Sequence, residues 1–280
     1  MAVKIVTDSV SDISPQIADE YGITVVPLNV NFGPETFRDG IDITTEEFYH
    51  RLQNGDVLPS SGSPSPQIFA DAYEKLSYSV NEILVITIGQ KLSVTGEAAR
   101  QGVSLMASKT CRVEVVVSEQ AMMAEGLLVI AAAKTAQNGA SLDDLVKLTK
   151  GNIDRVDLRI AFDTLEYLKR GGRIGKAQAL VGTVLGINPI LGIKDGEVFP
   201  FARERSRQKA MDYLYKFAAG YRNIEEIAVE DATTPDETDA LVERLGTLVD
   251  KSRIYRTKVS PVIGTNVGPR AIGVAVLGDM

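Results

Sequence analysis

The sequence predicts an α/β protein made of two α/β domains. Short runs of β-branched and aliphatic residues alternate with amphipathic segments of helical length, a pattern typical of sheets covered by helices. The chain has 280 residues, 44% of them hydrophobic and 24% charged, which is enough material for two ordinary domains. We place the first domain at residues 1–151, with a mainly parallel sheet covered by helices, and the second at residues 152–280, with a mixed sheet.

Strands and helices alternate along the first domain. Strands are expected at residues 4–7, 23–28, 83–87 and 113–117, and helices at 15–21, 45–52, 66–76 and 95–107. A Pro/Ser/Gly loop is expected from Pro59 to Pro66. The apolar stretch 121–136 is interrupted by Glu125 and Lys134, so it predicts a core helix. Gly139-Ala140-Ser141 then ends that helix and caps a further one.

The pattern changes near residue 152. A strand is expected at residues 159–162, and Asp195-Gly196 between two short apolar runs is a strong hairpin signal. A helix at 206–219, a strand at 226–229 and a helix at 235–249 follow, and a final pair of strands flanks a loop at 264–269.

Charge and hydropathy exclude several classes of protein. The net charge of −7 argues against nucleic-acid binding and against a polybasic surface for anionic membranes. The N-terminus lacks the charged and apolar regions of a signal peptide, and no apolar run approaches the roughly 20 residues that cross a bilayer. We therefore expect a cytoplasmic protein without integral membrane association.

Catalytic chemistry also has little support in the sequence. A single histidine, His50, and a single cysteine, Cys111, leave no plausible zinc site or Cys/His pair, and His50 is expected at the surface. The Walker loop, the GxGxxG fingerprint and the GxSxG elbow are all missing. We expect no cofactor and no metal.

Polar residues follow three of the predicted strands. Asp8-Ser9, Gly89-Gln90 and Ser118-Glu119 lie at or just beyond strand ends, where parallel sheets collect their ligands. Four segments are also rich in hydroxyl groups, glycine or arginine: residues 7–12, 59–66, 91–96, and the Arg203, Arg205 and Arg207 group together with 265–269. Helix caps, turns and solvated arginines explain each of them equally well. The residues alone predict an anion-binding cleft without a catalyst.

The set and order of these segments resemble the DegV family, over nearly the whole length of the chain. The match runs through residues 5–12, 39–48, 163–175, 186–191, 205–210 and 264–269, and the segment Asp163-Thr164-Leu165-Glu166-Tyr167-Leu168-Lys169-Arg170-Gly171-Gly172-Arg173 is its most specific part. The resemblance implies two α/β domains that bury a long-chain fatty acid at their interface, with the carboxylate near the surface of the cleft.

The resemblance also implies the residues that bind the carboxylate: Ser61, Ser93, Arg205 and Asn266. Three positions depart from the family pattern. Gly62 replaces a hydroxyl residue, Val94 replaces a glycine and Asn266 replaces a histidine. Asparagine can donate a hydrogen bond to a carboxylate but cannot carry a proton or a positive charge.

The family further implies that the protein presents its fatty acid to a separate fatty acid kinase. Lys169, Arg170 and Arg173 form a basic cluster on an acidic chain and are candidates for docking that partner, although a solvated helix end is an equally good explanation. One alternative is a divergent binder of another lipid or apolar carboxylate without kinase coupling. Another is a small-molecule hydrolase or phosphotransferase that uses Ser61 or Ser93, for which the sequence offers no base.

Overall fold

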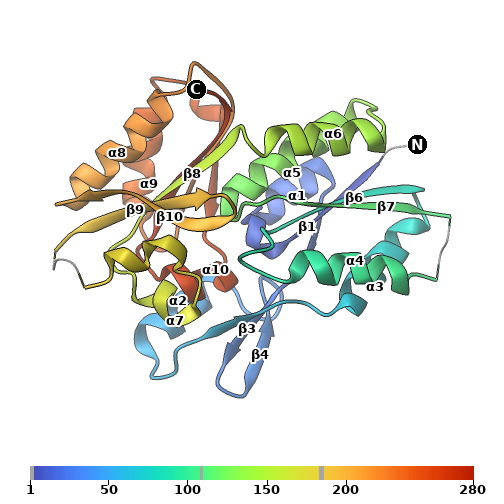
Figure 1. The fold of residues 1–280 in the computed structure, drawn as a ribbon, viewed down its shortest axis with the longest axis horizontal. Helices are drawn as coiled ribbons and strands as arrows, with labels where there is room; N and C mark the ends of the chain where they lie inside the picture. The colour runs from blue at the N-terminus through green and yellow to red at the C-terminus, as the bar shows by residue number, and fades with distance from the viewer. Residues whose placement is uncertain (1–2, 108–109, 183–185) are drawn as a thin grey trace.

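The computed structural model describes residues 3–107, 110–182 and 186–280. Two α/β halves lie side by side, the N-terminal half on the right of Figure 1 and the C-terminal half on the left. The predicted fold class is confirmed, since one main sheet is parallel and the other is mixed. The expected boundary at residues 151 and 152 falls in the last turn of α6 (Leu142–Asn152). It stays a prediction, because α5 (Met122–Gln137) packs against both halves.

A parallel sheet with the strand order β2-β1-β6-β7 organises the first half. Its strands are β1 (Lys4–Asp8), β2 (Thr24–Val26), β6 (Glu82–Thr87) and β7 (Arg112–Val117). Successive side chains point to opposite faces. Ile5 and Leu84 therefore join the core around α5, whereas Val6 and Val85 join a separate core beneath α3 and α4.

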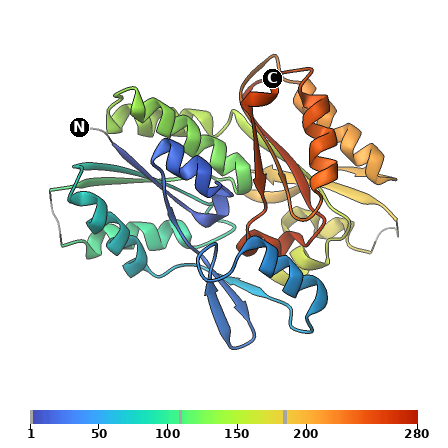
Figure 2. The same ribbon diagram turned by 180° about the vertical axis from the view of Figure 1, so that it is seen from behind.

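Helices cover both faces of this sheet. On one face lie α1 (Pro15–Tyr21), α5 and α6, and on the other lie α3 (Pro66–Ser77) and α4 (Thr95–Leu105), as Figures 1 and 2 show. The helix α5 is buried on all its sides, because the successive residues Leu127, Leu128, Val129 and Ile130 are each at most 1% exposed. This confirms the predicted core helix and makes it the element that joins the two halves.

The second half is built on a six-stranded sheet with the order β10-β9-β8-β13-β11-β12. Its strands are β8 (Val156–Ala161), β9 (Asn188–Lys194), β10 (Glu197–Glu204), β11 (Asn223–Asp231), β12 (Ile254–Lys258) and β13 (Ile272–Asp279). Only the β11–β12 pair is parallel. The predicted hairpin is confirmed, since Asp195 and Gly196 have φ values of 55° and 73°, which suit a tight Asp-Gly turn. The helices α8 (Arg207–Ala219) and α9 (Pro235–Leu245) cover the outer face.

A small antiparallel sheet, β4-β3-β5, extends from the first half at the bottom of Figure 1. It consists of β3 (Asn29–Phe32), β4 (Glu35–Arg38) and β5 (Ser60–Gly62), and α2 (Thr45–Asn54) follows β4. Here the prediction of a loop from Pro59 to Pro66 was wrong for its first part. The segment Ser60–Gly62 pairs with β3, an edge strand that satisfies backbone groups without needing apolar side chains of its own.

Two short helices lie where the halves meet. They are α7 (Glu166–Gly171) and α10 (Pro261–Val267), which contact each other. The expected loop at residues 264–269 is wrong in its first part, because Gly264 to Val267 are helical. Ser260 at the cap position and Pro261 at the first turn start this helix, and Gly268, at φ 79°, follows its end. The part of the chain that the structure describes also contains the 3-10 turns η1 (Ser9–Ser11), η2 (Gly175–Leu180) and η3 (Lys251–Arg253).

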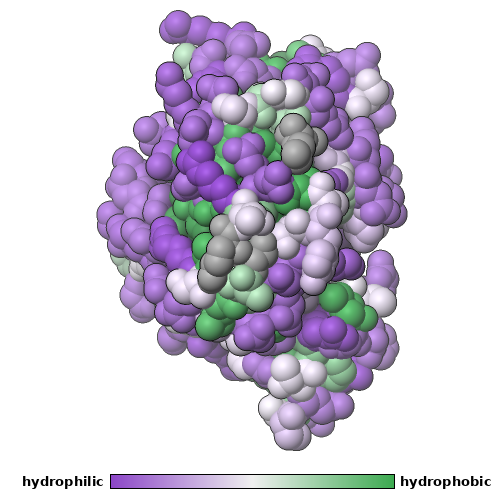
Figure 3. Space-filling model, turned by 90° about the vertical axis from the view of Figure 1, so that its right-hand side faces the viewer, coloured by the Kyte–Doolittle hydropathy of each residue, from purple (hydrophilic) through white to green (hydrophobic). Residues whose placement is uncertain are grey.

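The surface is largely polar. Figure 3 shows the end of the first half as mostly hydrophilic, with smaller hydrophobic areas between the polar side chains. His50 is exposed on α2, as predicted. Within residues 3–107, 110–182 and 186–280, no helix is both long and apolar enough to cross a membrane.

Candidate functional site

A narrow cavity of about 100 Å³ lies between the two halves, at the carboxyl edge of the parallel sheet. Asp8 lies at this edge, at the end of β1, and its carboxylate accepts hydrogen bonds of 3.0 Å from the amides of Val10 and Ile88. Val10 and Ile88 in turn line the cavity. The strand-end residues singled out in the sequence do not line the cavity themselves, whereas their chain neighbours Val10, Ile88 and Ala121 do.

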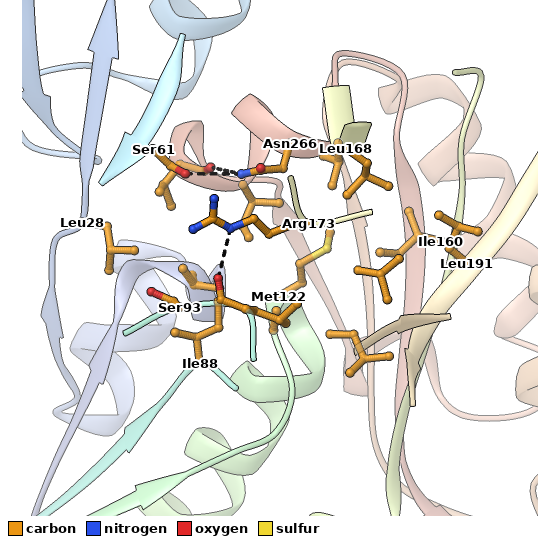
Figure 4. A pocket seen from close by; sticks show the side chains of 18 of the residues that line it. Leu28, Ser61, Ile88, Ser93, Met122, Ile160, Leu168, Arg173, Leu191 and Asn266 are labelled. Atoms are coloured by element: carbon orange, nitrogen blue, oxygen red, sulfur yellow. Dashed lines mark hydrogen bonds between the residues drawn. The ribbon is translucent and has the colours of Figure 1, made fainter. Parts of the chain in front are cut away.

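The walls of the cavity are mostly aliphatic. The mixed sheet contributes Ile160, Leu191, Ile193 and Val198, and Phe162 follows directly after β8. Further apolar wall comes from Leu28, Leu92, Ala121, Met122, Leu168, Val262, Ile263 and Val267. Figure 4 shows Ile160 and Leu191 on one side of the cavity and Ser61, Ser93 and Arg173 on the other. The site thus has an apolar end and a polar end.

Ser61 and Asn266 meet at the polar end. Ser61 lies in β5 opposite Val30, and Asn266 lies in the last turn of α10. The Asn266 amide Nδ2 donates to the Thr265 hydroxyl at 2.8 Å and lies 3.5 Å from Ser61 Oγ, a long and weak contact. An amide held in this way can turn a donor toward an anion in the cavity.

Ser93 belongs to a group of hydroxyls at the same polar end of the cavity. Its Oγ lies 2.9 Å from Ser63 Oγ and 2.8 Å from Thr95 Oγ1. Ser63 also lines the cavity and was not among the predicted site residues. The sequence did hold a signal for Ser63. It is the second residue after Ser61, also carries a hydroxyl, and alternate residues of a strand can reach the same side. Val94, which occupies the family's glycine position, is 70% exposed and has φ −82°, so the turn tolerates its branched side chain.

Arg173 supplies a guanidinium at the polar end. Gly172 caps the end of α7, and its φ of 70° turns the chain back toward the cavity. Arg173 then donates from Nε to Leu92 O at 3.2 Å and from an Nη to Gly171 O at 2.7 Å, and so reaches from the second half to the first (Figure 4). The sequence placed Arg173 with Lys169 and Arg170 on a docking surface. In the structure all three side chains are exposed, and Arg173 also lines the cavity.

Arg205 does not join this group. It follows the end of β10 and is exposed, whereas the residue of β10 that lines the cavity is Val198, at the beginning of the strand. Seven residues at about 3.3 Å each separate the two positions by roughly 23 Å along an extended strand. Arg205 therefore does not line the cavity and its contact with a carboxylate stays a prediction, whereas Arg173 is an arginine that lines the cavity.

Buried carboxylates lie behind the cavity. Desolvation raises the pKa of Asp8 to about 7, even though its two backbone hydrogen bonds favour the charged form. Burial also raises the pKa of Glu125 well above its usual range, although Thr7 donates to it at 3.2 Å. Glu230, on the second half, is fully buried and accepts from the Met123 amide at 3.1 Å. These groups pack the interface and do not line the cavity.

The arrangement offers binding groups and no catalytic constellation. The hydrogen bonds of Ser93 lead to other hydroxyls rather than to a base, and His50 is exposed on α2. Among the described residues, no group of three or more His, Cys, Asp or Glu side chains could hold a metal ion. The polar and apolar ends of the cavity are complementary to a molecule with an anionic head group and an apolar tail.

Comparisons with known proteins agree with this geometry. The family model of uncharacterised DegV-family proteins matches residues 2–279. The chain belongs to the DegV family. A DegV domain-containing protein of Clostridium perfringens is 33% identical over 280 residues, covering 98% of each chain. Among solved structures, a DegV-family protein of Thermus thermophilus is 30% identical, with a TM-score of 0.89 over 99% of this chain and 100% of that one. DegV of Bacillus subtilis is 28% identical, with a TM-score of 0.89 over 99% of each chain.

Those two solved structures are described as fatty-acid-binding proteins and not as enzymes. This DegV-family chain shares their two-domain fold over its whole length. The resemblance inferred from the motifs is therefore confirmed at the level of family and fold.

Proposed function

We propose that this DegV-family protein binds a long-chain fatty acid in the cavity between its two halves. The observation that carries the proposal is the division of the cavity into an aliphatic end around Ile160 and Leu191 and a polar end at Ser61, Ser93, Arg173 and Asn266. Burying a dozen methylenes at about 0.8 kcal/mol each would contribute on the order of 10 kcal/mol before the costs of association. The fatty-acid-binding descriptions of the Thermus and Bacillus relatives support the same ligand class.

The head group belongs at the polar end. Arg173 carries five N–H donors, more than its bonds to the carbonyls of Leu92 and Gly171 require. Its charge-assisted hydrogen bonds would be the strongest that the site offers to a carboxylate. Ser61, Ser93 and the Asn266 amide add neutral donors around the same position.

Presentation of the head group to a fatty acid kinase is the second part of the proposal. An outer cavity of about 260 Å³ shares Ser61, Arg173 and Asn266 with the inner one and is also lined by Tyr167 and Arg170. A carboxylate at the polar end would thus face a space that a partner protein can enter. Lys169, Arg170 and Arg173, all exposed near this opening, are the candidates for docking that partner.

Lipid extraction tests the binding function. The protein is purified from a bacterial host without detergent, extracted with organic solvent and analysed by mass spectrometry. We expect about one fatty acid per chain. Protein without lipid that also fails to take up added oleate or palmitate would contradict the proposal. A separate assay with a purified bacterial fatty acid kinase and labelled ATP tests presentation, and a lipid-loaded protein that yields no acyl phosphate would favour a binder without kinase coupling.

A further inference from the structure

A second, larger cavity opens on the side of the molecule that faces the viewer in Figure 2. This groove has a volume of about 840 Å³ and lies between α1, the start of α2 and β12, with Ser260 and Pro261 at the start of α10. Its lining shares no residue with the fatty-acid cavity. Even around η1 the two linings are distinct, since Ser9 and Asp12 line the groove and Val10 lines the cavity. The groove is thus a separate candidate site, and the proposed function does not use it.

Unpartnered polar atoms are concentrated in the lining of this groove. Asp12 and Asp39 are 5% and 4% exposed, and Asp12 Oδ2 and both carboxylate oxygens of Asp39 lack a hydrogen-bond partner. The hydroxyl of Thr257 on the same wall is unpartnered as well, whereas that of Ser260 lies near the Asp12 carboxyl. The Ser9 hydroxyl and the Val262 amide lie near Asp39 without making a hydrogen bond of good geometry. Buried carboxylates without partners are costly, and a ligand with N–H donors would satisfy them.

The charge of the groove points to a cation. The basic side chains at its rim are already engaged: Lys258 lies 2.8 Å from Asp231, and Arg256 forms an ion pair with Asp239. Asp19 and Glu46 add further negative charge to the lining. Burial raises the pKa of both Asp12 and Asp39 to about 7, although contacts with Ser260 and Glu230 lower that of Asp12, so an ammonium group beside them would favour their charged forms.

The shape of the lining favours an organic cation over a metal ion. Ile13, Ile23, Val25 and Ile41 cover much of the groove with aliphatic surface, which a hydrated metal ion would not use. The described residues also lack a group of three acidic, histidine or cysteine side chains that could hold a metal. We propose that the groove binds an aliphatic diamine. One ammonium group would donate to Asp12 and Asp39, the methylenes would lie on the aliphatic wall, and the second ammonium would reach Asp19 or Glu46 at the rim.

Isothermal titration calorimetry with putrescine tests this proposal on the full, lipid-loaded chain. We would work at pH 8, where Asp39 is ionised and the amine protonated, and at 150 mM NaCl, which screens weak surface attraction. Saturable binding of one putrescine per chain is expected. Asp39→Asn should weaken the affinity by about tenfold or more, since the variant loses the charge-assisted hydrogen bond to the ammonium group. Asp12→Asn should do the same and can keep accepting from the Ser260 amide.

The matched control is Asp56→Asn, which removes the same charge from an exposed residue that does not line the groove. It should leave the affinity unchanged. Circular dichroism and thermal melting show whether each variant is folded. Absence of a saturable signal, equal affinity in the Asp39→Asn and Asp56→Asn variants, or magnesium binding that displaces putrescine would each overturn the proposal. Lipid occupancy is measured on the same samples, so failure here is distinguishable from failure of the fatty-acid function.

Discussion

Gly171 lies against the side chain of Asn266 at the polar end of the cavity. A Cβ atom added at Gly171 would fall 2.0 Å from Asn266 Oδ1 and 3.1 Å from its Cγ, so only glycine leaves room for the amide in its present position. The last residue of α7 in the second half thus fixes how the last turn of α10 presents its amide next to Ser61. The contact couples the chain segment that carries Arg173 to the segment that carries Asn266.

The substitution Gly171→Ala should therefore displace Asn266. Because Oδ1 is the far end of a side chain that can turn away, we expect a nearly unchanged melting temperature and a lower fatty-acid occupancy after purification. Gly151→Ala is the matched control, because this helical glycine has open space around its Cβ position and alanine favours helix. If Gly171→Ala retains full occupancy, the Asn266 amide is not needed at its present position.

Replacing Arg173 and replacing Arg205 should have different effects on the affinity for the fatty-acid head group. Arg173→Met keeps an unbranched apolar stem and removes the guanidinium, so fatty-acid affinity should fall by about tenfold, as for other hydrogen bonds to charged groups. Arg205→Met removes the same charge from an exposed position outside the cavity and should leave affinity unchanged. Competition with a fluorescent fatty acid measures both affinities. The reverse result would restore Arg205, the residue that family resemblance suggested, and remove Arg173 from the site.

The sequence predicted the order of the main strands and helices because their periodicity is local and strong. The core helix α5 and the Asp195-Gly196 hairpin are examples. It missed the β4-β3-β5 sheet, whose third strand, Ser60–Gly62, has no apolar pattern and exists only through its partner strand. Ser61, Ser93 and Asn266 were named from the resemblance, and the structure brings all three to one cavity. Arg173 is exposed as expected, but its place in the cavity lining was missed, because its direction depends on the left-handed Gly172 and spacing alone does not reveal that turn.

Stability should depend on pH through Asp39. Its pKa rises from the ordinary 3.8 to about 7 on folding, chiefly because burial desolvates it. Between these values the folded state keeps a proton that the unfolded state has lost, so the free energy of unfolding falls as pH rises through this window. Asp39→Asn should stabilise the protein at pH 8 by up to a few kcal/mol, at about 1.36 kcal/mol per pKa unit, and should have no such effect near pH 4.

Asp42 provides the matched control for this prediction, with the opposite sign. Its hydrogen bonds to Arg38 lower its pKa from 3.8 to about 2, so it stabilises the fold above pH 3.8 and loses this effect as the pH falls through 2. Asp42→Asn should therefore destabilise the protein slightly at pH 8. Urea unfolding at pH 4, 6 and 8 measures both variants. A pH profile for Asp39→Asn that is parallel to that of the unmodified protein would show that Asp39 does not titrate in this window.

The apolar end of the cavity should limit the length of the acyl chain. Ile160 lies in β8 and directs its side chain into the cavity, opposite the polar end (Figure 4). Ile160→Trp would place an indole where the proposed chain lies, so the extracted lipid should shift to shorter acids or be lost. The fold should persist, because the added volume enters the cavity and not the packed core. Ile160→Val, which removes one methylene at a cost of about 0.5–1.5 kcal/mol, should leave the lipid distribution nearly unchanged. Mass spectrometry of the extracted lipid compares the three proteins. An unchanged distribution in a folded Ile160→Trp variant would mean that the acyl chain takes another route, because an indole and a chain of a dozen methylenes cannot fill the same narrow space.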